Sequence, residues 1–128
     1  MLFLSAICNA FIVDWLLRQK VTSTLNMFYI YQLPIPRFQS GDRFFAEIVD
    51  RAAKLICTTP DFDDLAAEVG LSSHTNGATD PIERAKLRAE LDGIIAHLYG
   101  LTESEFAHIL TTFPIVPEST KLDRKSVV

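Results

Sequence analysis

One segment constrains the fold of this chain more than any other, residues 87–116, which read LRAELDGIIAHLYGLTESEFAHILTTFPIV. Its first part spaces Leu and Ile side chains three and four residues apart, which is typical of a helix with one buried face. A start signal precedes that helix at Asp80, an Asp cap followed directly by proline. Gly100 ends the helix, and Thr102 with Glu105 forms the capping-box pattern of a second one. The sequence therefore predicts two consecutive capped helices here.

The remaining periodicity favours a mainly α fold. Apolar residues also recur at helical spacing over residues 2–18, 42–57 and 60–69, so we expect four to five helices in all. Residues 25–36 differ, because their aromatic, Thr and Ile side chains favour extended backbone and their two prolines cannot lie inside a sheet. We therefore predict one short extended or β element near residues 25–36, and a small α+β fold is the alternative.

These patterns divide the chain into three parts. Residues 1–36 combine an apolar helix with an extended exit, residues 37–117 form a helical module, and residues 118–128 are expected to be a flexible tail. No capping residue precedes the first helix, since Met1 leads directly into the apolar pattern. We therefore expect the natural beginning of the protein to lie further upstream.

The first helix is apolar almost all round, which indicates either deep burial or a missing neighbour. Leu4, Phe11 and Trp15 share one of its faces and are the candidate partner interface. Because a lone domain rarely exposes such a face, we expect self-association through this helix. The segment lacks a basic start and is shorter than the about 20 apolar residues of a membrane span. We therefore expect a cytoplasmic protein without membrane contact.

Charge is distributed unevenly along the 128 residues, whose formal net charge is −4. Residues 1–60 hold six Lys and Arg against four Asp and Glu, whereas residues 61–128 hold six against twelve. The overall balance argues against a chain devoted to nucleic-acid binding, which would carry a basic surface. Any phosphate contact is therefore expected in the first half.

A group of basic and hydroxyl side chains there could contact DNA phosphates. Its members are Arg18, Lys20, Thr22 and Ser23, which lie beside several aromatic residues, together with Arg37 after the extended segment. The alternative is a solvated helix end, where cations are favoured by the helix dipole in any case. Both interpretations stay open on the residues alone.

Catalytic and metal-binding patterns are missing from the sequence. None of the five glycines belongs to a GxGxxG or Walker loop that would hold a nucleotide phosphate. His74, His97 and His108 do not have the spacing of metal ligands, and the two cysteines form no CxxC pair. We therefore predict no catalytic residue, no metal site and no cofactor in this chain.

Two regions resemble the C-terminal part of type IIG restriction–modification enzymes and related N6-adenine DNA methyltransferases. Residues 11–36 resemble the end of a target-recognition domain, with RQK after the apolar helix, a Thr/Ser-rich turn and the exit QLPIP. The pattern LRAELD…AHLYGL…E…ILTTFPIV in residues 87–116 resembles the helical tail that closes such enzymes, and residues 48–70 look like their helical connector.

The resemblance implies a bacterial parent that binds S-adenosylmethionine, flips an adenine out of duplex DNA and methylates its N6, with or without endonuclease activity. The Asn-Pro-Pro-Tyr/Phe motif of that chemistry is absent from the chain. We therefore expect a non-catalytic C-terminal fragment that contributes to target recognition and scaffolding. Its expected partners are the upstream methyltransferase and recognition domains and, weakly, duplex DNA. The alternative is an independent helical protein–protein interaction domain that uses the apolar N-terminal helix.

Overall fold

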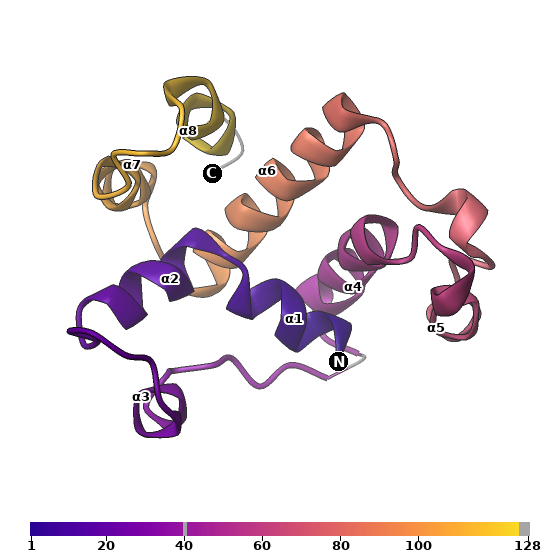
Figure 1. The fold of residues 1–128 in the computed structure, drawn as a ribbon, viewed down its shortest axis with the longest axis horizontal. Helices are drawn as coiled ribbons and strands as arrows, with labels where there is room; N and C mark the ends of the chain where they lie inside the picture. Colours follow the sequence, from indigo (N-terminus) through magenta and orange to yellow (C-terminus); the bar gives the residue numbers. More distant parts are fainter. Residues whose placement is uncertain (40, 126–128) are drawn as a thin grey trace.

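The protein, described as a computed structural model over residues 1–39 and 41–125, consists of helices joined by turns and extended segments (Figure 1). Its elements are α1 (Leu2–Cys8), α2 (Phe11–Arg18), α3 (Met27–Tyr31), α4 (Arg43–Ile56), α5 (Asp63–Glu68), α6 (Pro81–Leu98), α7 (Glu103–Thr111) and α8 (Glu118–Lys125), with 3-10 turns at Pro60–Phe62 and His74–Asn76. The mainly α class is confirmed. The expected number of four to five helices is wrong, because the described residues form eight.

The expected β element near residues 25–36 is also wrong, since no strand occurs in the described part of the chain. Residues 27–31 coil into α3 instead. The Asn26 side chain accepts hydrogen bonds from the backbone N–H groups of Phe28, at 3.0 Å, and Tyr29, at 3.4 Å. This cap starts a helical turn, whereas the strand preference of aromatic residues acts only where a partner strand is present. The backbone after α3 is extended, but it pairs with no strand.

The predicted first helix is divided into α1 and α2. The chain turns at Ala10, whose φ of −78° and ψ of 149° are those of extended backbone. Asn9 closes α1, because its side-chain amide donates a hydrogen bond of 2.8 Å to the carbonyl of Ser5. The turn lets α1 pack on α4 while α2 packs on α6 and α7. Burial inside this chain therefore accounts for most of the apolar side chains that surround the predicted helix.

The core lies where α1, α4 and α6 meet, and it draws on both sides of the expected boundary at residue 36. The Phe3 ring of α1 lies between the rings of Phe38, at 5.9 Å, and Phe45, at 5.3 Å. The largest fully buried side chains are Ile7, Val13, Ile48, Cys57, Ile95, Phe106 and Leu110. Residues 1–36 therefore share one core with the helices that follow them.

The two capped helices are confirmed as α6 and α7. The Asp80 carboxylate accepts the backbone N–H of Glu83 at 2.9 Å, and Pro81 occupies the first turn of α6. Gly100 adopts a φ of +71°, a left-handed conformation that favours glycine at a helix end. In the capping box of α7, the Thr102 N–H donates to the Glu105 carboxylate at 2.7 Å and the Thr102 hydroxyl accepts the Glu105 N–H at 3.3 Å.

Residues 118–125 do not form the expected flexible tail. They form α8, which packs on α6 and α7 (Figure 1). The side chains of Lys121 and Arg124 are buried there. The polar sequence ESTKLDRK does not predict a packed helix, because α8 is held in place by the buried ion pair between Arg124 and the distant Asp92. Residues 126–128, the rest of the expected tail, lie outside the described residues.

Candidate functional site

Arg18, the first of the predicted DNA-contact residues, is exposed at the C-terminus of α2. Its Nε lies 2.9 Å from a carboxylate oxygen of Asp14, one helical turn earlier. Its guanidinium also lies over the Phe113 ring, 4.7 Å from the ring centroid, which is cation–π geometry. The charge of Arg18 is therefore partly neutralised within the chain, and that weakens it as a phosphate contact.

Lys20 has a neutral partner instead. Its Nζ donates to the Gln32 side-chain oxygen at 3.2 Å, which links the end of α2 to the end of α3. Thr22 and Ser23 are exposed in the loop between these helices. Because an amide does not cancel a positive charge, Lys20 keeps its charge beside the two exposed hydroxyl side chains, and its predicted contact with DNA phosphates stays a prediction.

Arg37 is separated from this group. It is exposed in the extended segment that runs back beneath α1, next to Phe38, which contacts Phe3 near the start of α1 (Figure 1). The structure thus brings Arg18, Lys20 and the hydroxyl residues together and places Arg37 at the other end of the α1–α2 pair.

The three predicted partner-interface residues do not share one exposed face. Leu4 is exposed on α1, whereas Phe11 and Trp15 are half-buried on α2. The Phe11 ring packs edge-on against Phe113 at 4.9 Å. The sequence pattern placed these residues on one face of a single helix. The bend between α1 and α2 divides that helix, so the residues no longer share a face.

The sequence did not predict a second apolar surface, which lies on and just before α3. We call it the α3 face and define it as Leu25, Met27, Phe28 and Tyr31. None of the five residues of α3 is buried. The exposed fractions reach 67% for Phe28 and 79% for Tyr31. The only signal in the sequence is the helix-capping Asn26 before MFYIY, because a single turn is too short for a periodic pattern.

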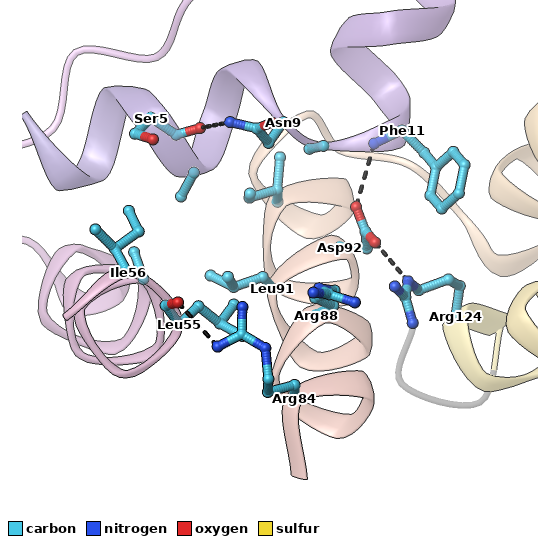
Figure 2. Close-up of a pocket in the computed structure, with 14 residues that line it drawn as sticks. Ser5, Asn9, Phe11, Leu55, Ile56, Arg84, Arg88, Leu91, Asp92 and Arg124 are labelled. Atoms are coloured by element: carbon cyan, nitrogen blue, oxygen red, sulfur yellow. Dashed lines mark hydrogen bonds and ion pairs between the residues drawn. The ribbon is translucent and has the colours of Figure 1, made fainter. Parts of the chain in front are cut away.

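A buried ion pair was missed as well. Arg124 of α8 and Asp92 of α6 are 6% and 8% exposed, and Arg124 Nε lies 2.5 Å from Asp92 Oδ2. The other Asp92 oxygen accepts the backbone N–H of Phe11 at 3.2 Å, so one carboxylate joins α2, α6 and α8 (Figure 2). Burial raises the pKa of Asp92, and the charge of Arg124 opposes that shift.

The three histidines lie on three different elements, the 3-10 turn His74–Asn76, α6 and α7. His74 holds the loop after α5, because its backbone N–H, at 2.8 Å, and its ring Nδ1, at 2.7 Å, both meet one oxygen of Asp63. These two hydrogen bonds lower the pKa of Asp63. His97 and His108 are exposed on α6 and α7. Within the described ranges, no three His, Cys, Asp or Glu side chains are grouped as a metal site would require.

Comparisons with protein-family models, with curated proteins and with solved structures found no match to this chain. Among the helices of residues 1–39 and 41–125, none combines the length and the apolar character needed to cross a membrane. The function of this chain is therefore inferred from the resemblance in its sequence and from the geometry of its described residues.

Proposed function

We propose that this chain is the non-catalytic C-terminal module of a restriction–modification DNA methyltransferase. In that role it scaffolds the upstream domains and adds weak phosphate contacts to target recognition. The motifs in residues 11–36 and 87–116 support this proposal, because their order and spacing resemble the C-terminal part of adenine-specific methyltransferases. On this proposal S-adenosylmethionine and the methyl-transfer chemistry belong to the upstream domains.

The single observation that carries the scaffolding role is the exposed α3 face. An apolar turn with no buried side chain gains little from packing within this chain, since burial of apolar surface is the main favourable term in folding. Contiguous exposed apolar surface of this kind commonly marks a protein–protein contact. We infer that the upstream domains of the parent cover the α3 face.

The phosphate-contact group lies next to this face, because the Lys20–Gln32 hydrogen bond joins the ends of α2 and α3. A parent domain that covers α3 would therefore bring its bound DNA close to Lys20, Thr22 and Ser23. With Arg18 already paired to Asp14, few cations remain free at this place to release counterions from DNA. The proposed contribution to DNA affinity is accordingly small.

The association with an upstream partner is tested first. The reading frame directly upstream should encode an Asn-Pro-Pro-Tyr/Phe motif, and its product should co-purify with this chain when the two are expressed together. Phe28→Glu should reduce co-purification at least tenfold, because it places a charge at the centre of an apolar contact. Ile82→Glu is the matched control, since Ile82 is also highly exposed, at 81% against 67% for Phe28, but lies at the start of α6.

An unrelated upstream reading frame, or equal loss with both variants, would contradict the methyltransferase proposal. If the frame is unrelated and Phe28→Glu still disrupts self-association in light scattering, the chain is an independent interaction domain instead. In that case the surface is α3 and not the N-terminal helix.

DNA binding by the isolated chain is expected to be weak. We expect a dissociation constant on the order of 10⁻⁴ M for a labelled duplex at low salt, near the weak end of non-specific binding. Lys20→Ala should lower the slope of log K against log salt by about one, because one phosphate contact is lost. Fluorescence anisotropy at several salt concentrations measures the slope. Lys86→Ala, an exposed cation of α6, should leave it unchanged, and an equal effect of both variants would rule out a local contact.

A further inference from the structure

A cavity of about 420 Å³ opens between α1, the start of α2, α4, α6 and α8 (Figure 2). Neither Lys20 nor any residue of the α3 face lines it. Ser5 and Asn9 of α1 line one side, and Leu55 and Ile56 of α4 line another. Its volume is within the range of about 300–1,000 Å³ that is typical of small-molecule sites. The cavity also combines an apolar floor with a few convergent polar groups, which is the usual character of such sites.

The cavity is strongly cationic. Arg84, Arg88 and Arg124 line it, and among the described residues Asp92 is the only acidic side chain in the lining. Both oxygens of Asp92 are already engaged, one by Arg124 and the other by the backbone N–H of Phe11. The lining therefore carries a formal charge of +2 in a chain whose net charge is −4. A concave site with apolar walls concentrates such a field.

Two of these arginines have no acidic partner within residues 1–39 and 41–125. Arg84 donates to the backbone carbonyls of Leu55, at 3.0 Å, and Ala78, at 2.7 Å, and these neutral acceptors leave its charge in place. Arg88 makes no hydrogen bond or ion pair with any residue of the described chain. By contrast, Arg51 and Lys86 nearby both meet the carboxylate of Glu90.

Arg84 and Arg88 also stand one helical turn apart on α6. Like charges at this spacing repel each other and disfavour the helix, unless an anion lies between them. Guanidinium groups bind oxyanions through pairs of parallel N–H groups, which suits phosphate better than chloride. A ligand held by Arg88 would also reach the apolar floor formed by Leu91 and Ile95.

We propose that this cavity binds a small dianionic phosphate monoester with a compact apolar body, its phosphate on Arg88 and Arg84 and its body against Leu91 and Ile95. Arg124 contributes to the positive field but stays paired with Asp92. The site is independent of the proposed methyltransferase role, because it uses neither the α3 face nor the phosphate-contact group around Lys20.

The probes are inorganic phosphate and phenyl phosphate, titrated into the full chain at constant ionic strength and followed by NMR. We expect saturable shifts confined to the lining, namely residues 5–11, 52–56 and 84–95 and Arg124, with phenyl phosphate binding at least fivefold more tightly than inorganic phosphate. Arg88→Ala should weaken the binding of phenyl phosphate at least tenfold. Arg88→Lys should restore only part of the affinity, because lysine lacks the planar guanidinium with its parallel N–H donors. Arg88 is exposed, so these variants should keep the fold, which a circular dichroism spectrum checks.

Lys86→Ala is the matched control, because Lys86 is an exposed cation of the same helix and does not line the cavity. It should leave the affinity for phenyl phosphate unchanged. Shifts that do not saturate at 10 mM phosphate (about the weakest affinity worth assigning to a site), or equal losses with Arg88→Ala and Lys86→Ala, would overturn the proposal. Duplex DNA that binds through Arg88 while phenyl phosphate does not would also overturn it.

Discussion

Replacing Asp92 by alanine is expected to lower the free energy of unfolding by about 3–5 kcal/mol, the usual cost of leaving one partner of a buried ion pair unpaired. The variant leaves the guanidinium of Arg124, a residue only 6% exposed, without its ion-pair partner, and it removes the acceptor of the Phe11 N–H. Because the carboxylate joins α2, α6 and α8, the C-terminal helix should detach before the rest unfolds. Urea denaturation gives the total loss, and hydrogen exchange of α8 shows the detachment.

The double variant Asp92→Ala with Arg124→Met separates the ion pair from its surroundings. Removing both charges leaves no buried ion, so the double variant should be more stable than Asp92→Ala alone, although it still lacks the acceptor for Phe11. A double variant that loses as much as the sum of the two single variants would show that Asp92 and Arg124 do not interact in solution.

Replacing Phe106 by alanine is expected to cost about 3–5 kcal/mol, the usual range for truncating a buried aromatic side chain. Phe106 is 1% exposed and packs with Ala96 and Leu110 where α7 meets α6. The substitution leaves a cavity in place of the phenyl ring. The surrounding helices cannot close this cavity completely, because the capping box and Gly100 hold the start of α7 in place. Thermal and chemical denaturation measure the loss.

Phe28→Ala is the matched control for that variant, since Phe28 is 67% exposed on the α3 face. Its effect on the isolated chain should stay within about 0.5 kcal/mol, as for most surface substitutions. Equal losses for the two phenylalanine variants would mean that α3 packs against the core. That result would also remove the main support for the proposed docking of upstream domains.

The sequence predicted best the elements whose signals are local. Asp80, Thr102 and Gly100 mark helix ends through contacts to backbone groups three to five residues away, and such contacts can be recognised from residue type and spacing. α3 also has a local cap in Asn26, but the strand preference of the aromatic residues around it favoured the prediction of an extended or β element.

The candidate site was predicted only in part. Arg18, Lys20, Thr22 and Ser23 are neighbours along the chain, so their proximity followed from the sequence directly. Arg37 is only fourteen residues beyond Ser23, yet its neighbour Phe38 packs against Phe3 near the start of α1, far from the end of α2 where Arg18 lies. The cationic cavity could not be predicted at all, because its lining combines residues of α1 and α2 with residues of α4, α6 and α8, which are distant in the sequence.

The sequence by itself determined the mainly α class, the capped helices α6 and α7 and the resemblance that underlies the proposed function. These depend on side-chain periodicity and short-range capping, which are properties of neighbouring residues. Only the tertiary structure decided that the first helix bends at Ala10, that the polar C-terminal segment is held by Asp92, and that the apolar surface left exposed is α3. Each of these depends on contacts across many residues, up to 81 between Phe11 and Asp92, and such contacts form only when the whole chain packs.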